Sequence, residues 1–136
     1  MVYYCRLIEE GGAFTVEFPD VPSVLTLGDT QDEALFNAWG ALNAALANDI
    51  SMGFELPTNS ASATIRFPVE VEPHVLIAAE LRKLRGSALQ SEIARRLNLS
   101  YQAYQRLENP TKGNPTVKTL EKVARAFGKR LNVSLV

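Results

Sequence analysis

The stretch from Leu89 to Asn109 constrains the fold more than any other part of the chain. Ile93 and Leu97 recur at helical spacing and predict a short helix with one apolar face, with the small Ala94 where a second helix could cross closely. The next residues break this pattern and end at Ser100, a favourable N-cap. A tight turn and a second short helix are therefore expected.

In the second helix Tyr104 and Leu107 are predicted to point inward. The outward residues are Tyr101, Gln102, Gln105 and Arg106. This arrangement is a helix-turn-helix, whose second helix enters the major groove of DNA. Amphipathic helix pairs also occur in proteins that do not bind DNA, so the motif needs support from the rest of the chain.

The distribution of charge gives that support. Residues 1–72 hold two basic and eleven acidic residues, a net charge of −9, whereas residues 73–136 hold twelve basic and four acidic residues, a net charge of +8. We expect two domains with these boundaries and with different partners. The basic domain suits a polyanion, and the acidic domain suits a cationic protein surface.

Residues 89–109 resemble the Cro/C1-type helix-turn-helix of phage and bacterial repressors, and KGNP at 112–115 and 119–129 extend the likeness. The matching residues are Gln90, Ile93-Ala94 and Leu107-Glu108-Asn109. In that family the glutamate forms an ion pair with a basic residue of the first helix. This implies a structural ion pair of Glu108 with Arg82 or Lys83. A departure is Pro110, which stands where the family usually has Gly.

The acidic domain alternates in the manner of strands around one helix. That helix should start after Thr30 and run to about Asn48, with Gly40 allowing close packing against a strand. The predicted order is β-β-β-α-β, an α+β fold of one sheet and one helix. The predicted strands are 2–8, 13–18, 24–27 and 64–71.

Several motifs together resemble the HicB family of antitoxins. They are Phe18-Pro19-Asp20-Val21-Pro22, Thr26-Leu27-Gly28-Asp29-Thr30, Asp32-Glu33-Ala34 and Leu56-Pro57. The resemblance implies a partial ribonuclease H-like fold without its active site. It also implies an antitoxin that binds and neutralises a small basic HicA-type mRNA-cleaving toxin and represses its own operon. The chain shortens the family's usual Pro-x-Pro after the long loop to Leu56-Pro57-Thr58.

The basic domain should be all-α apart from its end. Pro73 suits the first position of a helix that ends at Gly86, and 116–127 predicts a helix capped by Gly128. Leu131–Val136 alternates like a short C-terminal strand, which needs a partner. Either its twin in a dimer or another part of the same chain could supply that partner. We expect a homodimer, possibly part of a higher oligomer, because helix-turn-helix proteins usually read two half-sites.

The candidate site residues divide between the domains. Gln102 and Arg106 are expected to read adenine and guanine, and Tyr101 to stack on a sugar or meet a thymine methyl group. The DNA-binding residues as a whole are Gln90, Ser100, Tyr101, Gln102, Gln105, Arg106, Lys112 and Asn114. Asp29, Asp32 and Glu33 are expected to bind the toxin by charge complementarity.

Other functions receive less support. One Cys and one His cannot supply a tetrahedral metal site, so no metal or cofactor is expected. Cys5 reads as a packed thiol, and the absence of a signal peptide or apolar span favours the cytoplasm. An alternative is a ligand-responsive transcription regulator with an α+β sensor domain. A nuclease is a third hypothesis, but no carboxylates cluster, so we expect that the chain is not an enzyme.

Overall fold

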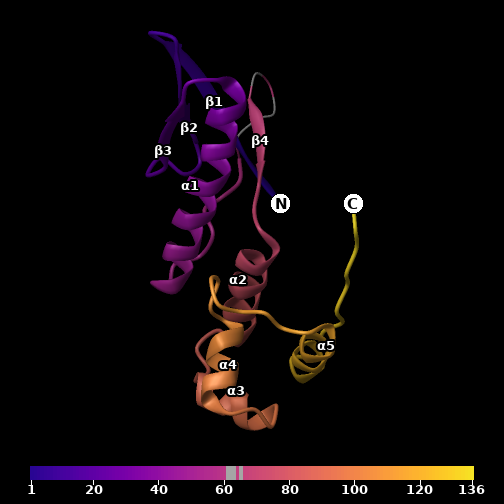
Figure 1. Cartoon of the computed structure of the whole chain (residues 1–136). Coiled ribbons are helices and arrows are strands. Elements are labelled where there is room, and N and C mark those ends of the chain that lie inside the picture. The colour runs from indigo at the N-terminus through magenta and orange to yellow at the C-terminus, as the bar shows by residue number, and fades with distance from the viewer. Residues whose placement is uncertain (61–63, 65) are drawn as a thin grey trace. The chain divides into compact units, whose positions relative to one another are not determined.

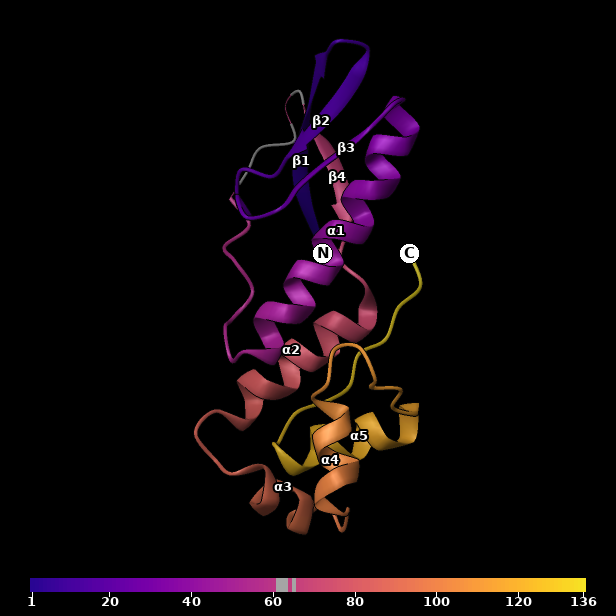
Figure 2. The ribbon, with the colours of Figure 1, turned by 60° about the vertical axis from the view of Figure 1, so that its left-hand side comes forward.

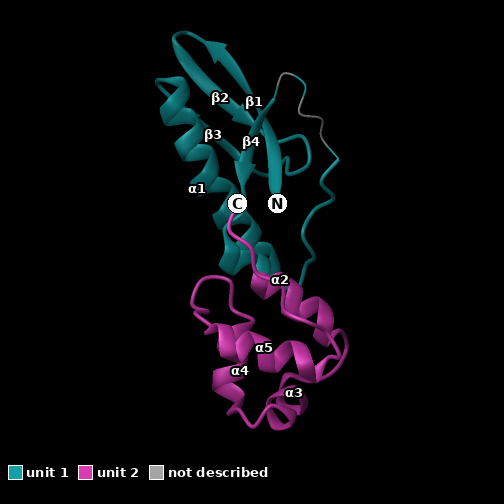
Figure 3. Cartoon of the chain, turned by 90° about the vertical axis from the view of Figure 1, so that its right-hand side faces the viewer, with its two compact units in different colours: residues 1–76 teal, residues 77–136 magenta. Residues whose placement is uncertain are grey.

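A computed structural model describes residues 1–60, 64 and 66–136. The chain forms two compact units, the N-terminal unit Met1–Leu76 and the C-terminal unit Ile77–Val136 (Figure 3). The boundary falls inside helix α2 (Pro73–Arg85), whereas the predicted domains meet at its first residue. Among the described residues, no helix is long and apolar enough to cross a membrane.

The N-terminal unit contains an antiparallel sheet of four strands in the order β3-β2-β1-β4 (Figures 1 and 2). Gly11 and Gly12 connect β1 to β2 with positive φ angles, as a two-residue hairpin turn requires. β4 carries Pro68 at the edge of the sheet, where a missing N–H is tolerated. The strands are β1 (Val2–Glu10), β2 (Ala13–Glu17), β3 (Leu25–Gly28) and β4 (Phe67–Glu70).

Helix α1 (Gln31–Ser51) covers one face of this sheet (Figure 1). Its N-cap is Thr30, whose hydroxyl oxygen accepts a hydrogen bond from Glu33 N at 3.1 Å, as predicted. The amide of buried Asn43 donates to Glu70 O and accepts from Glu72 N, so it joins α1 to the end of β4 without an unpaired polar group. The core residues include Tyr3, Cys5, Val16, Ala34, Ala38, Leu42, Leu46 and Val69.

Several local predictions have clear outcomes here. Cys5 is a packed thiol, as expected, and burial raises its pKa to about 11. The role predicted for Gly40 is wrong, because Gly40 is exposed and an added Cβ would meet nothing within 4 Å. The close approach occurs instead at Gly28, where an added Cβ would lie 2.3 Å from Ala34 N. Of the last predicted strand, residue 65 lies outside the described residues.

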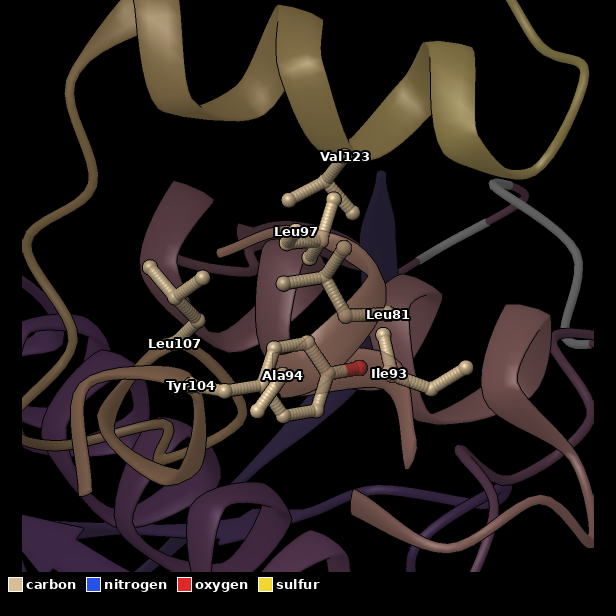
Figure 4. Close-up of a cluster of buried hydrophobic side chains, with 7 residues drawn as sticks. All are labelled: Leu81, Ile93, Ala94, Leu97, Tyr104, Leu107 and Val123. Carbon is tan, nitrogen blue, oxygen red and sulfur yellow. The ribbon is translucent and has the colours of Figure 1, made fainter. Parts of the chain in front are cut away.

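The C-terminal unit consists of helices around a small apolar cluster. Val123 points from α5 toward Leu97 and Leu81, and the Tyr104 ring fills the space beside Ala94 (Figure 4). The helices that follow α2 are α3 (Gln90–Arg96), α4 (Tyr101–Leu107) and α5 (Val117–Ala126). This helical unit after an antiparallel sheet agrees with the predicted fold class.

The alternative in which residues 131–136 dock back onto the same chain as a strand is wrong for the described residues. Residues 129–136 form no strand, and Val133 and Leu135 are exposed. The alternation of apolar residues is real, but a strand forms only where another strand supplies hydrogen bonds. In the described part of the C-terminal unit, no such strand is present.

Two glycine substitutions test this account of the N-terminal unit. Gly28→Ala should lower the free energy of unfolding by about 3 kcal/mol, because its Cβ would overlap backbone of α1. Gly40→Ala should instead raise the helix stability by about 1 kcal/mol, because the site is open and helical. Denaturant unfolding in dilute solution measures both. Equal losses for the two variants would contradict the packing described here.

Candidate nucleic-acid interface

The turn between α3 and α4 fixes the start of the second helix. Asn98 adopts a φ of 55°, and Leu99 N donates to Ala94 O at 2.9 Å, which closes α3. Ser100 is the N-cap of α4, and its hydroxyl oxygen accepts from Ala103 N at 3.0 Å. The predicted helix-turn-helix is therefore present, and Ser100 has a structural role besides any contact with a phosphate.

Helix α4 presents one polar face and one buried face, as predicted. Tyr104 and Leu107 are buried, whereas the four residues expected to face DNA are exposed. Gln102 and Arg106 lie one helical turn apart on the exposed side. The exposed residues of α4 are Tyr101, Gln102, Ala103, Gln105 and Arg106.

The loop after α4 places two further candidates beside this helix. Lys112 and Asn114 are exposed, and the Asn109 side-chain oxygen accepts from Lys112 N at 3.1 Å. Gly113 lies against the end of α4, because a Cβ there would be 2.8 Å from Asn109 O and 3.0 Å from Arg106 O. No local sequence pattern singles out Gly113, although only glycine leaves room for this approach.

A buried carboxylate joins α4 to α2. Glu108 is fully buried, and Arg85 donates to both of its oxygens, from Nε at 2.7 Å and from a terminal nitrogen at 2.9 Å. Arg82 Nε donates to the Glu108 backbone oxygen at 3.1 Å. The main partner of Glu108 is therefore Arg85, one helical turn after Arg82, and the implied pair with Arg82 is secondary. The alternative pair with Lys83 is wrong, because Lys83 is exposed.

Gln90 connects this buried pair to the exposed face. Its amide nitrogen donates to Glu108 Oε1 at 3.1 Å, so Gln90 is half-buried and held in place. The Tyr101 hydroxyl lies 3.5 Å from the Gln90 amide oxygen, and Gln105 Nε2 donates to Tyr101 at 3.2 Å. These contacts join three of the predicted DNA-binding residues into one row that begins at Glu108.

The ionisation of Glu108 follows from these contacts. Burial opposes its charge, but the hydrogen bonds from Arg85 and Gln90 outweigh that cost and hold the pKa of Glu108 below its usual value. Burial raises the pKa of the neighbouring Tyr104 hydroxyl, and the Glu108 charge adds to this effect. Among the described residues, the Tyr104 hydroxyl has no hydrogen bond of standard geometry.

Exposed basic residues lie on α3, on α4 and on the loop that follows α4. Arg95 and Arg96 end α3, and Arg106 and Lys112 follow on α4 and its loop, all of them exposed. Such a surface attracts phosphates and releases counterions from DNA. Among the described residues, no group of three His, Cys, Asp or Glu side chains could hold a metal ion. The exposed basic residues are suited to a polyanion.

Comparison with known proteins agrees with both units. Residues 4–78 match the model of the HicB-like antitoxin of bacterial toxin-antitoxin systems, and residues 79–133 match a helix-turn-helix model. Antitoxin HicB 1 of Photorhabdus laumondii is 33% identical over 130 residues, which cover 94% of this chain and 81% of that protein. The chain belongs to the HicB family of antitoxins.

Other HicB proteins are similar over nearly the whole chain. Antitoxin HicB 2 of Photorhabdus laumondii is 30% identical, covering 98% of this chain and 95% of that protein. Antitoxin HicB of Escherichia coli K12 is 30% identical, covering 92% and 91%. A crystal structure of the N-terminal domain of Burkholderia pseudomallei antitoxin HicB has a TM-score of 0.48 and 20% identity, covering 53% of this chain and 99% of that domain.

Substitution of Arg85 tests the buried ion pair. Arg85→Ala should lower the free energy of unfolding by about 3 kcal/mol, because it leaves the buried Glu108 carboxylate without its main partner. Lys83→Ala removes an exposed charge from the same helix and should change it by less than about 0.5 kcal/mol. Urea unfolding followed by circular dichroism compares them. Equal costs would contradict the assignment of Arg85.

The pKa of Glu108 also predicts a dependence on pH. The folded pKa is below the usual value of 4.5, so the stabilisation is complete above pH 4.5 and is lost as the pH falls toward the folded pKa. Glu108→Gln should therefore lose less stability than the wild type between pH 5 and about pH 3. Unfolding measured across this range tests the sign. A steeper loss in the variant would contradict it.

Proposed function

We propose that this antitoxin binds and neutralises a small, basic, mRNA-cleaving toxin of the HicA type and represses its own operon by binding operator DNA. The observation that carries the DNA-binding half is the exposed polar face of α4, aligned by buried Glu108 inside a basic unit. The acidic N-terminal unit is suited to a basic protein. Neither role requires the chain to catalyse a reaction.

The exposed side of α4 supplies the base contacts in this proposal. Gln102 hydrogen-bonds an adenine edge and Arg106 a guanine edge, because these side chains offer the matching donors and acceptors. Tyr101 and Gln105 lie beside them and contact sugars or thymine methyl groups. Phosphates are bound by Gln90, Ser100, Lys112 and Asn114.

The C-terminal unit acts as a dimer in this proposal, since two helix-turn-helix units read two half-sites. The segment after Leu131 supports this, because Val133, Leu135 and Val136 are apolar and exposed. A groove in the same unit is lined by apolar residues, among them Ile77, Leu84, Leu120 and Leu131, and by the polar residues Glu80, Lys83, Lys129, Arg130 and Asn132. The terminal segment of one copy would cover apolar surface on the other.

The N-terminal unit holds the toxin in this proposal. Its fold is a partial ribonuclease H-like fold that serves as a binding surface. Asp29, Asp32 and Glu33 are exposed around the start of α1, where they meet basic residues of the toxin.

Operator binding separates base contacts from phosphate contacts. Gln102→Ala and Arg106→Ala should each weaken binding to the DNA upstream of this gene by about 1–3 kcal/mol and relax the preference at one base pair. Lys112→Ala should weaken binding to operator DNA and to unrelated DNA equally. It should also reduce the slope of log affinity against log salt concentration by about one. Fluorescence anisotropy with base-substituted operators measures both. Unchanged specificity in the Arg106 variant would contradict its role.

Charge reversal tests the toxin-binding surface. The triple variant Asp29→Lys, Asp32→Lys, Glu33→Lys should weaken binding of the basic product of the adjacent gene by at least about a hundredfold, because like charges would meet. A control with the same change in net charge reverses the exposed Glu9, Glu10 and Glu55. Co-purification and calorimetry compare the two. Equal losses would show that net charge alone matters and would contradict this surface.

A further inference from the structure

Helix α5 carries basic residues along the side that faces away from the core of the C-terminal unit. Lys118, Lys122 and Arg125 follow one another at spacings of four and three residues, which places them on one side of the helix. Lys129 and Arg130 come directly after the end of α5. All five residues are exposed. We name these five residues the α5 basic surface.

The α5 basic surface is separate from the polar face of α4. Val123 and Ala124 are the buried residues of α5, and the three helical members of the basic surface lie on the opposite side of the helix. In Figure 4, Val123 enters the apolar cluster at one end and the Tyr104 ring of α4 lies at the other, with Leu97 and Leu81 between them. The two polar faces point away from this cluster on different sides of the C-terminal unit.

A groove joins the end of α5 to the segment that follows it. Lys129 N donates to Ala124 O at 2.8 Å, which fixes where the chain leaves the helix. Arg125, Lys129 and Arg130 then line one groove beside α5. Among the described residues that line this groove, Glu121 is the only carboxylate, and it pairs with Arg125. Positive charge therefore continues from the helix into the groove.

The positions of these charges do not stabilise the helix. Lys118 lies in the first turn of α5, where the helix macrodipole favours acidic residues, and that turn contains no acidic residue. Lys122 lies within one turn of both Lys118 and Arg125, and like charges at such spacing destabilise a helix. The exposed pair of Arg125 with Glu121 offsets little of this repulsion. An anionic partner would remove it.

The composition of the α5 basic surface indicates which anion fits. None of its five members is aromatic, so it offers no platform on which unpaired bases could stack. It also lacks the apolar centre that is typical of an interface between proteins. Its helical members place one positive charge about every 5 Å along the axis, which suits a partner with regularly spaced negative charge. A DNA duplex supplies such charge, with one phosphate about every 3.4 Å along each strand.

We propose that the α5 basic surface binds the phosphate backbone of a second DNA duplex, without sequence preference, while α4 holds operator DNA. Lysine and arginine side chains contact phosphates whatever the base sequence is. One assembly would then bridge two segments of DNA. The site on α5 does not depend on α4, whereas its use during repression rests on the operator binding proposed above.

A bridging assay on the full-length protein tests this proposal. Immobilised DNA from upstream of the gene is saturated with the protein, and capture of a labelled duplex of unrelated sequence is measured at several salt concentrations. Lys118→Gln with Lys122→Gln should reduce capture by about tenfold or more and lower the slope of log affinity against log salt concentration by about two. The same variant should unfold no more easily than the wild type, because it removes like charges from one side of α5.

Matched variants separate this surface from net charge. Lys83→Glu on α2 changes the charge of the C-terminal unit by the same amount and should reduce capture much less. Glu121→Gln should raise capture about threefold, because it frees Arg125, whereas Glu80→Gln at an exposed position of α2 should change it little. Equal losses in the Lys83 variant and the double lysine variant would overturn the proposal.

The variant Gln102→Ala with Arg106→Ala distinguishes failure of this proposal from failure of operator reading. Duplex of unrelated sequence should still bind this variant and should still depend on Lys118 and Lys122, even if no operator is recognised. Absence of any captured duplex would overturn the proposal. Tighter capture of single-stranded RNA than of duplex would also overturn it and assign the α5 basic surface to RNA.

Discussion

The geometry of the DNA-binding face depends on one buried carboxylate. Glu108 has no exposure to solvent, so its charge must be matched inside the protein, and Arg85 does so with two hydrogen bonds. Helix α4 has only seven residues and would not be stable alone. Ser100 fixes its start, the Tyr104 cluster fixes its inner side, and the Glu108 pair fixes its end. The side chains that face outward are thereby held in one orientation.

The two units of this antitoxin carry opposite net charges, so their exposed surfaces suit different partners. Positive charge is exposed around α4, where a polyanion would lie, and acidic residues are exposed at the start of α1. Because the acidic and the basic surfaces lie on different units, DNA and a basic protein would not compete for one site. The different chemistry of each surface keeps their partners apart.

The sequence predicted those features that depend on local patterns. The Thr30 and Ser100 caps and the inward Tyr104 all follow from rules about neighbouring residues, and each is present. The sequence could not select Arg85 from the three basic residues of α2, because the partner of Glu108 depends on how two helices far apart in the sequence cross. The row from Gln90 to Gln105 was unpredictable for the same reason.

The failures have physical causes as well. Gly40 was expected to pack against a strand, since a helical glycine usually has a packing reason, but it lies on the open side of α1. The C-terminal alternation was expected to form a strand, and no strand of this chain is available to pair with it in the described residues. Both features lack a partner within one chain.

In the function proposed above, this antitoxin silences a ribonuclease while it remains able to bind DNA. The most direct test is RNA cleavage by the purified product of the adjacent gene, measured with increasing amounts of the full-length antitoxin. We predict that cleavage stops when the two proteins reach a fixed stoichiometric ratio, and that the complex still retards operator DNA. Cleavage that continues at full rate in excess antitoxin would contradict the account.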